Sequence, residues 1–355
     1  LLVRADARDS GHRSVRYYEL ALQLAHAAAA LDLVPSPDEI AAIDGFRTVL
    51  LTTMDRAGVP RPGVAERDGP SGRPSDAAPA GGEVELPPER PVEEILAELD
   101  ALIGLDHVKT EVRRLTSLLR VQQLRAEHDL PVIETGRHAV FVGNPGTGKT
   151  TVARLLSQIY RSLDVLSKGH LVETDRSDLV AGYVGQTATK TRAVLDAAMG
   201  GTLLIDEAYS LARGGENDFG RESIDTIVKF MEDHRDDLAV IAAGYPNEMQ
   251  QLIDTNPGLE SRFTRTLEFP DYTTEELVAI FQLIAGKQEY HLVPEATSRL
   301  GEVIDAEPRG RGFGNARFVR NVFEQAVSMH AVRLTDVASP TVDQLTSLHP
   351  ADIAP

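Results

Sequence analysis

The residues best suited to chemistry form one continuous stretch, Gly143-Asn144-Pro145-Gly146-Thr147-Gly148-Lys149-Thr150. It fits the pattern G-x-x-x-x-G-K-[ST], with an apolar run at 139–142 before it and a helical run from Thr151 to 160 after it. Glycines allow backbone N–H groups to point at phosphates, Lys149 supplies a positive charge, and the Thr150 hydroxyl can bind Mg²⁺. The sequence therefore predicts a nucleoside triphosphate site with Mg²⁺, built from 143–151.

Two carboxylates follow a second apolar run. Residues 202–205 are Thr-Leu-Leu-Ile, and Asp206 and Glu207 come directly after them. The carboxyl ends of parallel strands open onto the ligand crevice of an α/β sheet, so both acids should face the phosphates. Asp206 suits the Mg²⁺ shell together with Thr150, and Glu207 suits orienting or deprotonating an attacking water. We therefore predict a catalytic pair rather than a solvated strand end.

Alternating strands and helices must position these residues. Apolar runs at 138–143, 170–174, 202–206, 238–243 and 265–269 predict five strands, with helical patterns between them. We expect an α/β fold over 92–272, a parallel five-stranded sheet with helices on both faces. Helical patterns near 274–285, 294–306 and 315–334 predict a small all-helical domain over 273–337, and 338–355 reads as a short tail.

Residues 1–91 lack the alternating strand and helix patterns of the rest of the chain. Residues 1–56 carry two helical patterns. The second begins at Ser36-Pro37-Asp38-Glu39, which has a capping serine, a proline in the first turn and a glutamate three residues after the cap. These patterns predict a small helical N-terminal unit. Residues 57–91 are rich in proline, glycine and alanine and cannot bury enough apolar surface to order themselves. We expect a disordered linker that spans roughly 30 Å.

Composition excludes several classes of function. The chain has 355 residues, 42% of them hydrophobic, which suffices for a substantial core. It has no cysteine, so disulfides, thiolate catalysis and Cys-ligated metal sites are excluded. No long apolar run or signal peptide is recognisable, so we expect a cytoplasmic protein without membrane insertion. The net charge of −18 argues against a nucleic-acid partner.

The two motifs and their surroundings resemble AAA+ ATPases, specifically the CbxX/CfqX family. That family includes red-type Rubisco activases, sporulation stage V K-type proteins and type VII secretion ATPases. The resemblance covers about 95–333 and is carried by segments 102–105, 183–188, 205–209, 256–263 and 314–317. It implies an AAA+ P-loop domain followed by a helical lid domain, with ATP and Mg²⁺ as cofactors, ATP hydrolysis and a homo-oligomer, expected to be a hexamer.

The resemblance also implies roles for single residues. Arg262 resembles the arginine finger that reaches the ATP of a neighbouring subunit, with Arg265 as a second candidate. A guanidinium aimed at the γ-phosphate stabilises charge that develops in the transition state. Arg317 resembles the sensor-2 arginine, which contacts the γ-phosphate of its own subunit, although other arginines lie close by in the sequence. Ile103 and Gly104 resemble the segment that packs on adenine.

Tyr183 and Val184, followed by Gly185, resemble the pore loop with which hexameric AAA+ unfoldases grip a polypeptide client. An exposed aromatic side chain can contact an extended chain without reading its sequence, but Tyr183 could instead be buried under its loop. Tyr245 lies where many AAA+ proteins have a sensor-1 Asn, Ser or Thr, so the sequence departs from the family pattern at this position.

The favoured function is an ATP-driven machine that pulls on or remodels a protein, with type VII secretion as one setting. Two alternatives remain open: a DNA-associated ATPase of the clamp-loader or initiator type, and a slow nucleotide-dependent switch. Tyr183 and the acidic net charge argue against the first. Glu207 and Arg262 argue against the second, because both belong to hydrolytic machinery.

Overall fold

A five-stranded parallel sheet forms the centre of the structure, a computed structural model that describes residues 88–133, 136–181, 185–213, 219–335 and 337–353. The predicted helical unit at 1–56 and most of the predicted linker lie outside these residues. The strand order is β2-β3-β4-β1-β5, and all neighbouring strands are parallel. The strands are β1 (Ala139–Val142), β2 (Leu171–Thr174), β3 (Thr202–Ile205), β4 (Ala239–Gly244) and β5 (Thr266–Glu268). The five predicted strands are confirmed, with ends that differ by at most one residue.

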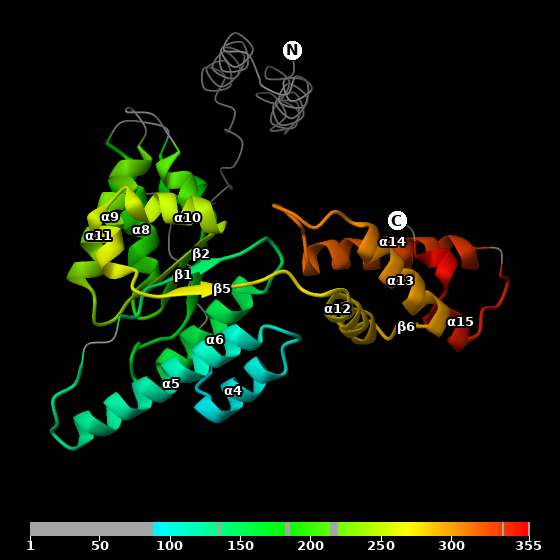
Figure 1. Cartoon of the computed structure of the whole chain (residues 1–355), viewed down its shortest axis with the longest axis horizontal. Helices are drawn as coiled ribbons and strands as arrows, with labels where there is room; N and C mark the ends of the chain where they lie inside the picture. The colour runs from blue at the N-terminus through cyan, green and yellow to red at the C-terminus, as the bar shows by residue number, and fades with distance from the viewer. Residues whose placement is uncertain (1–87, 134–135, 182–184, 214–218, 336, 354–355) are drawn as a thin grey trace, which may run out of the picture. The chain divides into compact units, whose positions relative to one another are not determined.

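Helices cover both faces of the sheet because the strands are apolar on both faces (Figure 1). Phe141 and Leu204 join one core cluster with α4 (Val92–Asp100), α5 (Asp106–Glu127) and α6 (Lys149–Ser162). Their neighbours Val140 and Leu203 join the other cluster. That second cluster contains residues of α7 (Arg176–Leu179), α8 (Thr187–Ala198), α9 (Gly220–Asp233), α10 (Pro246–Asp254) and α11 (Pro257–Arg262). The two-sided α/β layering expected from the sequence is confirmed.

The lid domain begins directly after Tyr272. Its long helices are α12 (Thr274–Lys287), α13 (Pro294–Ala306) and α14 (Ala316–Leu334), close to the predicted ranges. A capping box starts α12: the Thr273 side chain accepts from the backbone N–H of Glu276, whose carboxylate accepts from the backbone N–H of Thr273. This cap explains why the pattern changes from strand to helix at that point.

Within the segment 338–355, expected as a tail, residues 338–353 are described and are folded onto the lid domain. They form α15 (Val342–Thr346), β7 (Ser347–Leu348) and the 3₁₀-helix η2 (Pro350–Asp352), and β7 pairs in parallel with β6 (His291–Leu292). Leu348 and Ile353 are buried in the same core cluster as the lid helices. This part of the chain therefore belongs to the lid structurally.

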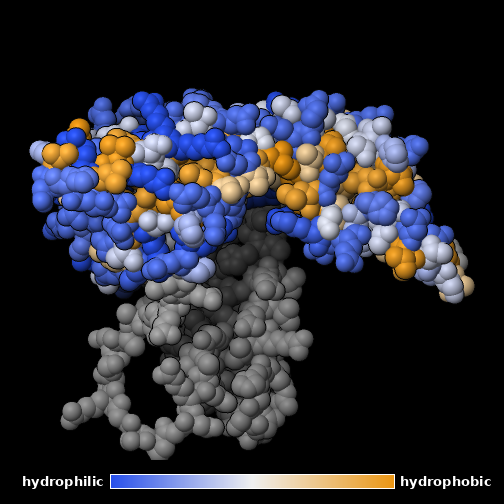
Figure 2. All heavy atoms as spheres, turned by 90° about the horizontal axis from the view of Figure 1, so that it is seen from below, coloured by the Kyte–Doolittle hydropathy of each residue, from blue (hydrophilic) through white to orange (hydrophobic). Residues whose placement is uncertain are grey.

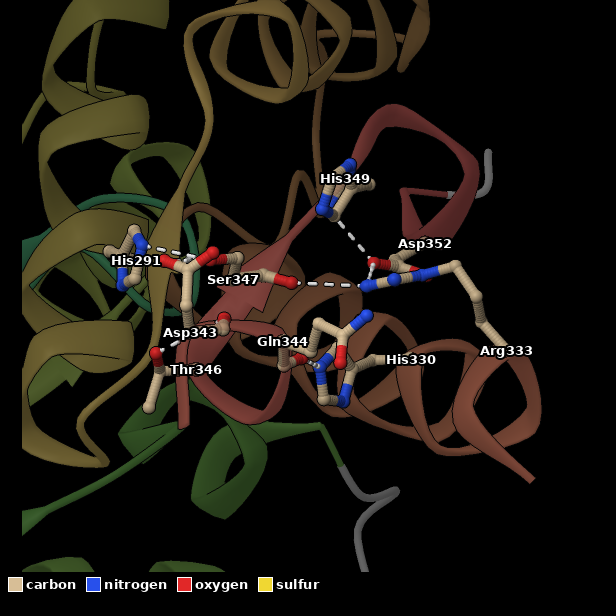
Figure 3. Close-up of polar contacts among 9 residues, drawn as sticks. All are labelled: His291, His330, Arg333, Asp343, Gln344, Thr346, Ser347, His349 and Asp352. Atoms are coloured by element: carbon tan, nitrogen blue, oxygen red, sulfur yellow. Dashed lines mark hydrogen bonds and ion pairs between the residues drawn. The ribbon is translucent and has the colours of Figure 1, made fainter. Parts of the chain in front are cut away.

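One ion pair anchors this segment (Figure 3). Arg333 on α14 donates from Nε and Nη2 to the two carboxylate oxygens of Asp352, at 2.9 and 2.8 Å, and from Nη2 to the Ser347 carbonyl at 3.0 Å. Asp352 is 1% exposed and also accepts from the backbone N–H of His349 at 2.8 Å. Burial acts to raise the pKa of Asp352, but the Arg333 and His349 hydrogen bonds outweigh it and the pKa is lowered.

Within the described residues, no helix is both long enough and apolar enough to span a lipid bilayer.

Candidate nucleotide site

The loop 143–148 connects β1 to α6 and has the conformation that its glycines permit. Gly146 has φ +74°, and a Cβ placed there would lie 2.2 Å from the Gly314 carbonyl oxygen. At Gly143 a Cβ would lie 2.3 Å from the Phe269 carbonyl oxygen. Only glycine allows both a positive φ and the close approach of another backbone segment, which follows β5 at Gly143 and belongs to the lid at Gly146. The phosphate-binding loop is thus fitted against other parts of the chain.

Lys149 begins α6 and its side chain turns back over the loop. Nζ donates to the carbonyls of Gly143 and Asn144, at 2.9 and 2.8 Å. Burial lowers the pKa of Lys149, and the negative charge of Asp206 partly opposes this shift. The predicted phosphate-binding cation and the predicted Mg²⁺ ligand are therefore electrostatic neighbours.

The two sequence motifs meet in one cavity of about 330 Å³. The loop residues Lys149 and Thr150 line it, and so do Asp206 and Glu207 at the end of β3. Both carboxylates are exposed to this space. Glu207 has φ 47° and ψ 41°, and its backbone N–H donates to Asp206 Oδ1 at 3.0 Å. The remaining lining residues are Gly143, Pro145, Gly146, Gly148, Thr151, Leu204, Tyr209, Ala243, Gly244, Tyr245, Ala316, Arg317 and Arg320.

The lid contributes arginines to this cavity. Arg317, the predicted sensor-2 residue, lies in the first turn of α14 with its side chain exposed, and it lines the cavity. Arg320, one turn later, also lines the cavity. Arg320 was not among the predicted site residues. Its spacing of three from Arg317 on a predicted helix would have placed both on one face.

A polar network joins the loop to the lid. Asn144 Nδ2 donates to both carboxylate oxygens of Asp271, at 2.9 and 3.0 Å, and Asn144 Oδ1 accepts from the Gly312 N–H at 3.0 Å. Buried Asn315 donates to Asp271 at 2.7 Å and accepts from the Tyr272 N–H at 2.9 Å. Asp271 was not among the predicted residues, and Asn315 lay in the segment 314–317 of the family resemblance without an assigned role. Nothing local in the sequence marks either residue as a partner of the loop.

The segment expected to pack on adenine lies beside the loop rather than in the phosphate cavity. Leu105 is buried, with Cδ1 3.3 Å from the Cβ position of Gly148. Gly104 abuts the Glu276 carboxylate at the start of α12. Ile103 is partly buried against the main core cluster. These residues therefore lie next to the end of the loop, and Ile103 and Gly104 do not line the cavity of the carboxylates.

Arg262 is located elsewhere. It ends α11, donates from Nη2 to Glu232 Oε2 at 2.7 Å and from Nη1 to the Gly258 carbonyl at 3.1 Å. Its charge, after burial and Arg137, helps to lower the pKa of His138 to about 4. His138 directly precedes β1, whereas the phosphate-binding loop follows β1. Arg262 is therefore near the opposite end of that strand, and the described lining of the cavity does not include it.

Of the other predicted residues, some line the cavity of the carboxylates and others do not. Arg265 lines a separate cavity with Leu118 and Thr264. Tyr245 lines the phosphate cavity at the end of β4, and the Arg311 guanidinium lies 5.0 Å from its ring centre. Tyr183 and Val184 lie outside the described residues, so the expected pore loop remains a prediction.

Comparison with known proteins agrees with this architecture. Residues 139–271 match the family described as "ATPase family associated with various cellular activities (AAA)", and residues 273–355 match the "AAA lid domain". The AAA domain of FIGL-1 in complex with ADP has a similar fold, with a TM-score of 0.52 and 17% sequence identity over 74% of this chain and 88% of that chain.

Several other proteins are more similar in sequence. Stage V sporulation protein K of Bacillus subtilis is 46% identical over 68% of this chain and 76% of its own length. The chloroplastic ribulose bisphosphate carboxylase/oxygenase activase of Cyanidioschyzon merolae is 44% identical over 68% of this chain and 84% of its own. The chromosomal protein CbxX of Cupriavidus necator is 42% identical over 74% and 84%. The chain therefore belongs to the CbxX-type AAA+ ATPases and is an ATP-hydrolysing enzyme.

Proposed function

We propose that copies of this chain assemble into a ring, expected to be a hexamer, that uses ATP hydrolysis to pull on a polypeptide client through a central pore. The position of Arg262 carries this proposal. A guanidinium near the start of β1 is separated from the loop at its end by a strand of four residues, about 13 Å. It cannot contact a phosphate in its own cavity, so its catalytic use requires a second copy.

The residues of one copy supply the rest of the site. The loop 143–151 binds the phosphates, Thr150 and Asp206 hold Mg²⁺, and Glu207 orients the attacking water. Oxygen donors are the ligands that Mg²⁺ prefers, and these two lie in the same cavity. Arg317 approaches the γ-phosphate from the lid. Ile103 and Gly104 lie beside the end of the loop, which supports a role for their segment next to adenine.

Exposed apolar side chains support association between copies. Leu118, Val121 and Leu124 are each at least 37% exposed on α5, and Val332 on α14 is 63% exposed. Figure 2 shows apolar patches that interrupt a mostly hydrophilic surface. Contiguous exposed apolar surface is typical of interaction sites, and the three residues on α5 lie three apart along one helix.

The client and the pathway are proposed on separate grounds. Tyr183 and Val184 are proposed to grip the client, on the basis of their motif. Type VII secretion is the pathway suggested by the family resemblance, whereas the relatives compared above have names that refer to sporulation and to Rubisco.

The experiment measures specific ATPase activity as a function of protein concentration, together with unfolding of a fluorescent protein that carries an unstructured tail. We expect specific activity to rise as copies assemble, because each site is completed by a neighbour. Tyr183→Ala should keep ATP turnover within a few-fold and lose client unfolding. Constant specific activity across the dissociation range, or full client unfolding by Tyr183→Ala, contradicts the assembly or the pore, respectively.

A further inference from the structure

A tyrosine lies beside the proposed catalytic glutamate. Tyr209 is in the 3₁₀-helix η1 (Ala208–Ala212), two residues after Glu207, and both side chains line the phosphate cavity. Tyr209 is only 4% exposed. Burial and the negative charge of Glu207 raise the pKa of Tyr209 to about 12. The phenol is therefore protonated at neutral pH and able to donate to the carboxylate.

The ring of Tyr209 is held on several sides. It packs against the Tyr245 ring, with centroids 5.9 Å apart and an interplanar angle of 37°, and the Arg213 guanidinium lies 4.3 Å from its centre. A Cβ at Gly244 would lie 2.7 Å from Tyr209 Cδ1, so the absence of a side chain there leaves room for the ring. The phenol hydroxyl is consequently fixed in direction.

The supporting Tyr245 is itself braced. Arg311 lies over its ring at 5.0 Å and forms an ion pair with Glu248, which follows Tyr245 by three residues. Arg311 belongs to the segment that leads into α14. The stack therefore runs from this segment through Tyr245 to Tyr209 and ends at Glu207.

The Glu207 backbone is fixed, but its carboxylate is not. The backbone is in the left-handed region, with its N–H bonded to Asp206 and its carbonyl accepting from the Ser210 N–H at 2.8 Å. The carboxylate is at the end of several rotatable bonds and faces the open cavity. A general base must be held within hydrogen-bond reach of the water that it activates. Some group must therefore orient this carboxylate.

We infer that Tyr209 is a positioning residue for ATP hydrolysis: its hydroxyl donates a hydrogen bond that aims the Glu207 carboxylate at the attacking water. The tyrosine does not contact the nucleotide in this role and acts only through Glu207. The inference rests on the proposed role of Glu207, and it goes beyond the family assignment by naming what orients that residue.

The test compares Tyr209→Phe with wild type in a steady-state ATPase assay and in binding of a fluorescent ATP analogue. Phenylalanine keeps the ring stack and removes only the hydroxyl. We expect kcat to fall about tenfold, with KM and the affinity for the analogue unchanged, because only orientation of the base is lost. The matched control is Tyr160→Phe, which also loses a buried hydroxyl, one that donates to the Arg137 carbonyl at 3.3 Å, and should have wild-type kinetics.

A double-mutant cycle separates positioning from a general structural effect. In a Glu207→Gln background, measured by single-turnover hydrolysis, Tyr209→Phe should cause no further loss. Equal losses in both backgrounds, an unchanged kcat, or a changed KM with constant kcat would each overturn the positioning role. If Glu207→Gln itself hydrolyses ATP at the wild-type rate, the proposed role of Glu207 fails first, which distinguishes the two failures.

Discussion

Arg262→Ala and Lys149→Ala subunits, each inactive alone, are expected to restore ATPase activity when they are mixed. Arg262 lies near the start of β1 and Lys149 just beyond its end, so one copy cannot use both on the same phosphate. Removing an arginine finger lowers kcat by about 10³-fold to 10⁵-fold in other nucleoside triphosphatases. Arg262→Ala should therefore bind ATP and fail to hydrolyse it, and Lys149→Ala should fail to bind it.

The fraction of ATPase activity restored in the mixture follows from the proposed head-to-tail ring, in which each site takes its finger from one neighbour. A complete site needs an Arg262→Ala copy that supplies the loop and a Lys149→Ala neighbour that supplies the finger. With random mixing at equal amounts, each condition is met in half of the cases, so about one quarter of the sites are complete. Activity should follow the product of the two mole fractions, with a maximum at equal amounts whatever the number of subunits.

The assay is steady-state ATP hydrolysis across mole fractions, with subunit exchange verified by energy transfer between labelled copies. Arg265→Ala is the comparison, since this arginine lies three residues on, lines a different cavity and is the second candidate for the finger. If Arg262 is the finger, the two variants behave differently. Mixed with Lys149→Ala, it should show only dilution of its own activity. A mixture of Arg262→Ala and Lys149→Ala that stays as inactive as its components, with exchange verified, would refute the trans assignment.

Other variants test the site and the lid. Lys149→Ala should lose ATP affinity in a titration calorimeter, whereas Glu207→Gln should keep it and lose turnover; equal affinity losses would contradict these roles. Gly146→Ala should weaken ATP binding about tenfold or more, because a Cβ at φ +74° meets the Gly314 carbonyl and strain there costs about 1–3 kcal/mol; unchanged affinity would show that the lid contact is dispensable. Asp352→Ala should cost about 1–3 kcal/mol in denaturant unfolding at pH 7, since several hydrogen bonds are lost, whereas the exposed Arg299→Ala should cost little. The pKa of Asp352 is lowered in the folded state, so its contribution to the free energy of unfolding is present at neutral pH and is lost as the pH falls through that pKa. The wild type and Asp352→Ala should therefore become equally stable in acid.

Local sequence determined the strands and both chemical motifs. Buried strands of a parallel sheet are short continuous apolar runs, which made β1 and β3 recognisable without tertiary information. Lys149, Asp206 and Glu207 line one cavity, and the sequence indicated their proximity because residues after parallel strands share one edge of the sheet. Glycines 143 and 146 were marked by a pattern whose backbone requirements are local.

Contacts between distant segments were decided only by the tertiary structure. Asn144 and Asp271 are 127 residues apart, and asparagine or aspartate alone predicts only a turn or a cap. Tyr209 and Tyr245 follow different strands, and their stack exists because β3 and β4 are neighbours in the sheet. Residues 342–352 have too few apolar positions for a readable period. They fold because β6 offers a free edge and Arg333 neutralises the buried Asp352, two conditions set by residues elsewhere in the chain.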